Sequence, residues 1–319
     1  MRIFITGGSG FVGGHLIEVL RGEHEVLAMA RSDRSVAAVE ALGAIAVRTA
    51  LGQVTPEQLD GVDAIVHAAA FVEEYGTREQ FRTVNVEGTR QLLEAAKAAG
   101  VKRFIHIGTE AAFFTGPDLV MIDESTPYPS GQRFLYSETK AEAERLVLAA
   151  NGPGFHTVSL RPRLIWGPRD ESVMGNIRDR ALKNEWVWLD GGRHHTSTCH
   201  VRNLVAAVEL ALTRGEGGRA YFIADDGERT LREFFDRLLA TQGVTLAQRS
   251  IPGWLARGAS VVVEGTWRGL SLSGTPPLTR FAAFMFSATV TVDTARARQE
   301  LGYAPVLTVE QGLVELAAG

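Results

Sequence analysis

The start of the chain passes directly from an apolar run, through a glycine-rich turn, into a helical pattern. The apolar run covers residues 3–5 and the helical pattern residues 15–20; between them lie Gly7, Gly8, Ser9, Gly10, Phe11, Val12 and Gly13. Glycines here permit a tight turn and let backbone N–H groups approach a pyrophosphate, which the helix N-terminus also attracts. The turn therefore predicts a dinucleotide site. Its spacing is Gly-x-x-Gly-x-x-Gly, wider than GxGxxG, and a turn that only reverses the chain is the alternative.

Strand and helix signals alternate as far as about residue 165. Short, nearly continuously apolar runs predict strands at residues 2–6, 25–30, 44–48, 64–67, 104–107 and 157–160. Such runs are typical of strands buried on both faces, and helical patterns between them, for example at 86–99, indicate right-handed βαβ units. The expected fold class is α/β, a Rossmann-type doubly wound parallel sheet. We expect a dinucleotide-binding domain at 1–168 and a smaller, mainly substrate-binding domain at 169–319, with some segments returning to the Rossmann core.

The alternation of strand and helix signals weakens after residue 168. Helices are expected at 201–213 and at 231–240, the latter behind a capping box of Thr230 and Glu233. A second capping box, Thr308 with Gln311, predicts the start of a C-terminal helix. Residues 243–290, rich in glycine, proline and aromatic residues, are expected to be irregular. An apolar irregular segment beside a cofactor domain suits a substrate pocket or lid, and a surface loop that covers core is the alternative.

Composition excludes several classes of protein. The net charge of −4 gives no reason to expect nucleic acid or an anionic membrane surface as a partner. The single cysteine, Cys199, excludes an internal disulfide framework, suits a reducing compartment, and is interpreted as structural. We expect no signal peptide and no membrane span, because the longest candidate, residues 254–263, is short and interrupted by Arg257. A cytoplasmic location is the resulting expectation.

A tyrosine and a lysine four residues apart form a second motif. Tyr136 and Lys140 lie one helical turn apart and so point the same way. Thr109 follows the predicted strand at 104–107, at the sheet end that should also hold the glycine turn. Each residue alone has a simple structural explanation: Thr109 could cap the strand end, Tyr136 could be a packed surface ring, and Lys140 could be solvated. Their convergence on one place favours a reaction site.

The chain resembles the extended short-chain dehydrogenase/reductase family. The resemblance covers nearly the whole chain and is carried by residues 6–13, 62–70, 85–89, 109, 136–140, 160–168 and 293–305. Within the family, residues 161–168 and 220–223 look most like the 3β-hydroxysteroid dehydrogenase-like branch. One departure is Gly108, where relatives commonly have a second serine.

The resemblance implies a mechanism. Tyr136 would be the general acid/base, with its pKa, ordinarily about 10, lowered by Lys140 and by the oxidised nicotinamide. Thr109 would orient the substrate oxygen and stabilise charge on it, and Lys140 would also bind the nicotinamide ribose. Further cofactor contacts are implied at His67, Ala68, Ala69, Asn85, Pro162 and Leu164. A homodimer is expected by analogy with relatives that pair through the Tyr-Lys helix.

The end of the second predicted strand indicates which nicotinamide cofactor is used. NAD enzymes usually have Asp or Glu there, but this chain has Ala30, followed by Arg31 and Arg34. Guanidinium groups bind a 2′-phosphate with paired hydrogen bonds, so NADP(H) is predicted, with NAD(H) as the alternative. Asp33 could neutralise Arg34 or bind the ribose 2′-OH itself. Ala50 replaces an Asp that often holds the adenine amino group, which puts the adenine contacts in doubt.

Two further polar groups receive structural interpretations. His194, His195 and His200 match no zinc-ligand spacing, so no metal site is predicted. Arg161 and Arg163 flank a proline at a strand end near the predicted nicotinamide. A salt bridge is the favoured role for Arg163, and contact with substrate is the alternative.

The favoured function is that of an NADP(H)-dependent ketone reductase or alcohol dehydrogenase. Its predicted substrate is partly apolar, either steroid-like or a β-keto or β-hydroxy compound. One alternative is a nucleotide-sugar epimerase or dehydratase that retains NAD. A dehydratase would lack its second acid here, because the residues that follow Glu110 are Ala111 and Ala112. Another alternative is a redox-sensing or scaffold protein that binds the cofactor without turnover.

Overall fold

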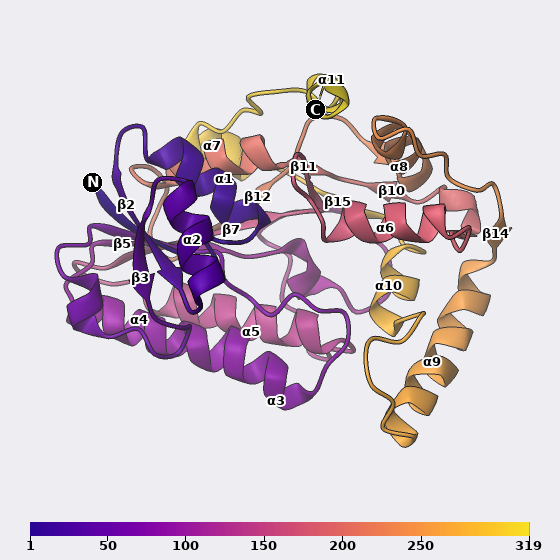
Figure 1. The fold of residues 1–319 in the computed structure, drawn as a ribbon, viewed down its shortest axis with the longest axis horizontal. Coiled ribbons are helices and arrows are strands. Elements are labelled where there is room, and N and C mark those ends of the chain that lie inside the picture. Colours follow the sequence, from indigo (N-terminus) through magenta and orange to yellow (C-terminus); the bar gives the residue numbers. More distant parts are fainter. Residues whose placement is uncertain (319) are drawn as a thin grey trace.

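The six predicted strands and a seventh at residues 219–223, which was not predicted, form one seven-stranded parallel sheet in the computed structural model, which describes residues 1–318 (Figure 1). In spatial order the strands are β12 (Arg219–Ile223), β7 (His156–Pro162), β5 (Arg103–Ile107), β4 (Ala64–His67), β1 (Arg2–Thr6), β2 (Glu25–Ala30) and β3 (Ile45–Arg48). Chain order runs outward from the centre in both directions, so the topology switches between β1 and β4. This confirms the predicted doubly wound fold, and in such sheets ligands bind outside the carboxyl ends of the strands at the switch point.

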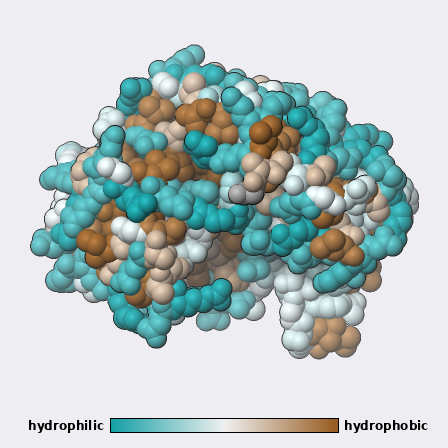
Figure 2. Space-filling view, turned by 45° about the horizontal axis from the view of Figure 1, so that its top comes forward, coloured by the Kyte–Doolittle hydropathy of each residue, from teal (hydrophilic) through white to brown (hydrophobic). Residues whose placement is uncertain are grey.

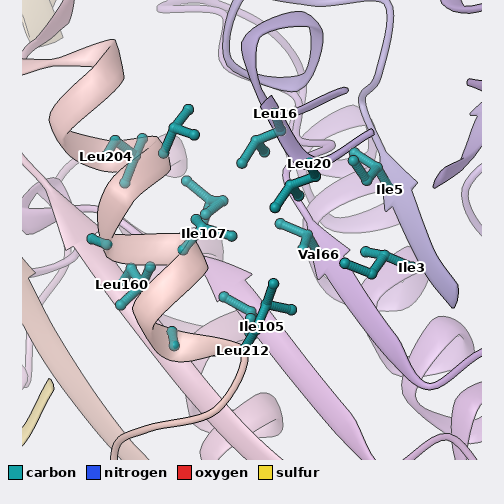
Figure 3. Packing of buried hydrophobic residues seen from close by; sticks show 14 of the residues in the cluster. Ile3, Ile5, Leu16, Leu20, Val66, Ile105, Ile107, Leu160, Leu204 and Leu212 are labelled. Carbon is teal, nitrogen blue, oxygen red and sulfur yellow. The ribbon is translucent and has the colours of Figure 1, made fainter. Parts of the chain in front are cut away.

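Helices cover both faces of the sheet because successive strand residues point to opposite sides. Ile3 and Ile5 of β1 pack toward α1 and α7, in the cluster drawn in Figure 3 with Leu16 and Leu204. Phe4 points the other way and packs toward α4 and α5. The helices of this part are α1 (Phe11–Leu20), α2 (Asp33–Ala41), α3 (Arg78–Phe81), α4 (Gly88–Ala98), α5 (Leu135–Ala149) and α7 (Val201–Ala211).

The smaller part of the molecule has short strands and a separate core. Its four-stranded sheet contains β13 (Arg229–Thr230), β10 (His195–Thr196), β15 (Val290–Val292) and β6 (Leu119–Ile122). Two-stranded sheets pair β11 (Cys199–His200) with β8 (Ile165–Trp166), and β14 (Ser250–Ile251) with β9 (Trp188–Leu189). The remaining helices are α6 (Val173–Leu182), α8 (Leu231–Ala240), α9 (Gly253–Gly269), α10 (Arg280–Met285) and α11 (Val309–Ala318). The core includes Trp166, Trp188, Phe234, Phe235 and Leu313.

Both predicted capping boxes form. The Thr230 hydroxyl accepts from Glu233 N at 3.2 Å and the Glu233 carboxylate accepts from Thr230 N at 2.8 Å. Gln311 Oε1 accepts from Thr308 N at 2.7 Å, and the Thr308 hydroxyl accepts from Gln311 N at 3.2 Å. Each pair of bonds satisfies backbone donors that a helix start would otherwise leave free.

The expectation that residues 243–290 are irregular is wrong for much of that segment. Residues 253–269 form α9 and residues 280–285 form α10. Glycines lower the helix propensity of α9, by about 1 kcal/mol each relative to alanine. However, Gly253, Ala256, Ser260 and Glu264 recur at helical spacing and bury one face, which packs against α10. Tertiary packing therefore overrides the local preference.

Two further observations concern the whole chain. Among residues 1–318, no helix combines the length and the apolar composition that crossing a membrane requires. Cys199 is fully buried in the main core, and burial raises the pKa of its thiol.

The domain division after residue 168 stays a prediction. Strand β12 and helix α7 follow that residue in the chain but belong to the part of the molecule with the large sheet.

Candidate active site

The carboxyl ends of the central strands lie in register and bring the predicted motifs together. Thr6 pairs with His67, His67 pairs with His106, and Ile107 pairs with Leu160. The segments that follow these strands therefore emerge at one edge of the sheet. They are the glycine turn, Ala68 and Ala69, Thr109, and the stretch from Pro162 to Leu164.

The glycine turn is too tight for side chains. Gly7 has φ +75°, and a Cβ built on it would lie 2.9 Å from Ala69 N. A Cβ at Gly13 would lie 2.1 Å from Gly7 O. Gly10 is the N-cap of α1 and gives it no side-chain cap. Phe11 and Val12 open that helix and Ser9 is exposed in the turn, so the backbone is free to approach a phosphate group, and the turn fits a dinucleotide.

Two residues predicted to contact the cofactor are engaged inside the protein. His67 Nδ1 lies 2.7 Å from Thr6 Oγ1, and its Nε2 lies 2.9 Å from Thr89 Oγ1. Burial, with a contribution from Lys140, lowers the pKa of His67 to about 3, so its ring is neutral. Asn85 Oδ1 accepts a hydrogen bond from Phe71 N, and Asn85 Nδ2 donates to Phe71 O and, at 3.1 Å, to Thr139 Oγ1. Both side chains tie together the elements that surround the site.

Tyr136 and Lys140 lie one turn apart on α5, and both face the end of β5. The Lys140 ammonium donates to Ile107 O at 2.8 Å and lies 3.3 Å from His106 Nε2. Burial lowers the pKa of Lys140 to about 8, against an opposing effect of Glu144. The Thr109 side chain lies close enough to the Tyr136 phenol to lower its pKa. The structure thus brings the three predicted catalytic residues together around one strand end.

The expected lowering of the Tyr136 pKa is not found in the protein by itself. Burial raises the pKa of the phenol, Glu110 raises it further, and only the Thr109 side chain opposes them. Lys140, whose ammonium donates to the Ile107 carbonyl, is not among the groups that shift this pKa. The phenol is therefore protonated at neutral pH, which is the state that a proton donor needs.

Glu110 is the residue that the sequence reasoning undervalued. The Thr109 hydroxyl donates to Glu110 Oε2 at 2.9 Å, and Glu110 Oε1 pairs with Arg163 Nη1 at 2.7 Å, with both side chains buried. The favoured interpretation of Arg163 as an ion-pair partner is thereby confirmed. Arg161 likewise pairs with Glu144 at 2.9 Å. The available signal was the position of Glu110 directly after Thr109.

Arginines gather beyond the end of β2. Ala30 is buried at the strand end, and Arg31 and Arg34 are exposed after it. Asp33 pairs with Arg48 at 2.7 Å, rather than with Arg34 as one interpretation held. Arg48 lies opposite Ala30 in the β2–β3 register. The sequence analysis missed Arg48, although its place at the end of the neighbouring predicted strand could have indicated it.

Several aromatic side chains pack beside Tyr136. The ring of Phe281, on α10, meets the Tyr136 ring edge-on at 5.7 Å, and Phe134 stacks on Phe114. Phe284 of α10 contacts Phe134. Leu164, next to the strand end, has φ +44°, a conformation that non-glycine residues rarely adopt outside constrained sites. The surroundings of the phenol are thus mainly apolar.

The three histidines considered as a metal set go to separate partners. His194 Nε2 lies 3.0 Å from Asp190, and His195 Nδ1 lies 3.7 Å from Glu228. His200 is buried against the Trp166 ring. Within the described residues 1–318, no group of three or more His, Cys, Asp or Glu side chains is placed to hold a metal ion.

Comparison with known proteins finds one family and several curated relatives. A sequence model of the NAD dependent epimerase/dehydratase family matches residues 3–224. A 4-hydroxy-2-methyl-3-oxo-4-farnesyl-3,4-dihydroquinoline-1-oxide ketoreductase from Stigmatella aurantiaca is 41% identical over 98% of this chain and 95% of its own. A 2-alkyl-3-oxoalkanoate reductase from Stenotrophomonas maltophilia is 34% identical over 100% and 99%. A 3-beta-hydroxysteroid dehydrogenase from Mycolicibacterium neoaurum is 32% identical over 98% and 90%.

A solved structure reproduces the fold at lower identity. The UDP-glucose 4-epimerase of Thermotoga maritima, with UDP-glucose, superposes with a TM-score of 0.77 and 21% identity. The superposition covers 100% of this chain and 98% of that one. At this identity the likeness concerns the architecture alone.

Proposed function

The chain belongs to the NAD dependent epimerase/dehydratase family and is an NAD(P)-dependent oxidoreductase of the extended short-chain dehydrogenase/reductase type. We propose that it reduces the carbonyl group of an apolar ketone with NADPH. The observation that carries this proposal is the convergence of Thr109, Tyr136 and Lys140 beside the glycine turn and against the aromatic side chains of α10. The relatives named as ketoreductase, 3-oxoalkanoate reductase and hydroxysteroid dehydrogenase support a substrate with a carbonyl or hydroxyl group on a large apolar body.

The glycine turn and the Tyr-Lys helix would hold the cofactor. The turn residues and the first turn of α1 suit its pyrophosphate, and Lys140 suits the nicotinamide ribose. Ala68, Ala69, Pro162 and Leu164 follow the strand ends around the same place. The nicotinamide, when bound, supplies or accepts the hydride.

The protein side chains supply the proton and its control. Tyr136 donates its proton to the carbonyl oxygen in the reductive direction, and burial keeps the phenol protonated until then. The Thr109 hydroxyl donates its single proton to Glu110 in the protein by itself, so it would turn from Glu110 to donate to the same substrate oxygen. The buried pair with Arg163 holds Glu110 in place.

The preference for NADPH rests on the arginines beyond β2. Arg31 and Arg34 are exposed where a 2′-phosphate would lie, and no carboxylate stands at the strand end. Asp33, the nearby acid, is paired with Arg48. We therefore propose that the arginines bind the phosphate and that Asp33 does not select NAD.

The test combines binding with turnover. Dissociation constants for NADPH and NADH are measured on protein stripped of nucleotide, followed by NADPH consumption with a panel of apolar and polar ketones. NADPH is expected to bind at least about tenfold tighter, which is about 1.4 kcal/mol, and apolar ketones are expected to be turned over. Tighter NADH binding would refute the cofactor assignment, and consumption confined to polar substrates would refute the substrate class.

The alternative, an epimerase or dehydratase with retained NAD, has one observation in its favour. Glu110 places a carboxylate beside Thr109, as an additional acid/base group would require. That carboxylate is committed to the buried pair with Arg163, so the reductase is the better-supported proposal. Purified protein that carries stoichiometric NAD would reverse this preference.

A further inference from the structure

Helix α9 turns an apolar face away from the rest of the protein. Gly253, Ala256, Ser260 and Glu264 bury one side of this 17-residue helix. The exposed side consists of Trp254, Leu255, Gly258, Ala259, Val261, Val262, Gly265, Thr266 and Gly269, with Arg268 at its edge. Trp254 is 73% exposed and Val262 69% exposed. A helix face that meets only water ordinarily carries several charged side chains, so this face calls for a partner.

The apolar character continues past the end of the helix. Residues 269–275 are all exposed and carry no charge, and they include Leu270 and Leu272. In Figure 1, α9 projects away from the body of the protein beside α10, and in Figure 2 this projection is mostly white and brown. We call residues 253–285 the arm.

We propose that the arm docks on the surface of an anionic lipid membrane, with the exposed side of α9 and residues 269–275 entering the interface. A helix with tryptophan and aliphatic residues on one side lies in the plane of such an interface, with arginines at the lipid phosphates. The arm contains Arg257, Arg268 and Arg280 and a single acid, Glu264, which is buried. The arm is thus locally positive although the chain has a net charge of −4.

The acids that face the arm offset its charge only in part. Glu74 of the loop before α3 accepts a hydrogen bond from Thr279 Oγ1 at 2.6 Å, so it lies against the base of α10. The Arg268 guanidinium pairs with Glu264 at 3.8 Å and lies over the Tyr75 ring at 5.7 Å, and its side chain remains more than half exposed. Arg180 of α6 donates to Pro277 O at 2.9 Å and adds a further cation beside the arm.

A second copy of the chain is a poorer occupant because the face is small. A 17-residue helix is about 25 Å long, and a strip about 10 Å wide along it offers roughly 250 Å². A stable dimer buries about 800 Å² on each partner. A lipid surface sets no such minimum, because each apolar side chain contributes as it inserts.

The arm also connects the membrane to the candidate site. Helix α10 packs against α9 and places Phe281 against the Tyr136 ring at 5.7 Å. An apolar ketone dissolved in the bilayer would therefore approach the phenol along the aromatic side chains of α10. This last step rests on the proposed function, whereas the docking does not.

The test uses the full chain and vesicles of defined composition. Sedimentation is measured with phosphatidylcholine vesicles with and without phosphatidylglycerol, for the wild type, Val262→Glu and a matched control, Val314→Glu. Val314 is a valine of α11 with 70% exposure, outside the arm. The wild type and Val314→Glu should sediment with the anionic vesicles, and Val262→Glu should lose at least about tenfold in binding. Equal thermal unfolding of both variants shows that they are folded.

A spectroscopic measurement locates the contact. Lipids brominated on the acyl chains should quench the fluorescence of Trp254, and the quenching should fall in Trp254→Phe to what Trp267, the other tryptophan of the arm, contributes. Wild type that stays in the supernatant with both kinds of vesicle refutes the proposal. So does a dimer in solution that Val262→Glu dissociates without any vesicle binding.

The docking and the proposed function fail separately. Vesicle binding requires neither cofactor nor turnover, so Tyr136→Phe should sediment like the wild type. Wild type that reduces apolar ketones but never sediments refutes only the docking. Wild type that sediments but reduces no ketone supports the docking and refutes the reductase.

Discussion

The seven-stranded sheet and the arm are governed by different constraints. In the sheet, Ile3 and Phe4 of one strand are both fully buried, each against helices on its own side. In the arm, Glu264 is buried while Trp254 and Val262 are exposed, which inverts the usual relation of polarity to burial. The sheet thus buries its apolar side chains within the chain, whereas the arm leaves apolar side chains exposed, as the proposed docking requires.

The largest effect is expected at Tyr136, on the sheet side of the comparison. Tyr136→Phe removes the proton donor and keeps the ring against Phe281, so kcat should fall about 10²–10⁴-fold while NADPH affinity stays unchanged. Tyr75→Phe, which also keeps its ring, is the control and should retain activity. Steady-state kinetics and cofactor titration decide this. Full activity in Tyr136→Phe would remove the phenol from the mechanism.

A pair of glycine substitutions compares the two regions directly. Gly13→Ala forces a Cβ to within 2.1 Å of Gly7 O and should weaken NADPH binding at least about 100-fold or unfold the turn. Gly258→Ala in the arm meets no atom within 4 Å and should stabilise the protein by up to about 1 kcal/mol. Cofactor titration and chemical unfolding measure both. Equal tolerance at the two positions would contradict the close approach required in the turn.

Glu110→Gln tests the electrostatics around the phenol. Glu110 raises the pKa of Tyr136, so neutralising it should lower that pKa. The alkaline limb of the pH–rate profile for ketone reduction, where the phenol loses its proton, should then move to lower pH. Because Arg163 loses its partner, unfolding should also become easier by about 3–5 kcal/mol.

The control for that variant is an exposed pair. Glu94→Gln on α4 removes an ion pair with Arg90 in solvent and should change stability by less than about 1 kcal/mol. The double variant Glu110→Gln, Arg163→Met should recover stability but keep the shifted pH profile. An unshifted profile in both variants would show that Glu110 acts only through packing.

The smallest predicted change concerns Arg31. Arg31→Ala should weaken NADPH binding about tenfold and leave NADH binding unchanged, because only NADPH carries the 2′-phosphate. Arg193→Ala, an exposed arginine of the smaller part, is the matched control. Equal losses for both cofactors would place Arg31 away from the 2′-phosphate.

Prediction from sequence succeeded where local pattern and burial agree. The apolar runs became the sheet, and Thr109, Tyr136 and Lys140 meet because parallel strands bring their carboxyl ends to one edge. It failed for residues 253–269, where glycines obscured a helix whose buried spacing makes sense only against α10.

The sequence by itself determined the doubly wound sheet, the glycine turn and the placing of the motifs, because buried strands and close backbone contacts restrict residue types directly. The tertiary structure alone decided the partners of the charged groups that pair over long distances in the sequence. Glu110 and Arg163 are 53 residues apart in the sequence, and Asp33 and Arg48 are 15 residues apart. Local sequence patterns do not predict ion pairs between residues this far apart. It also decided the direction of the Tyr136 pKa and the exposure of α9, since burial is a property of the assembled molecule rather than of any one segment.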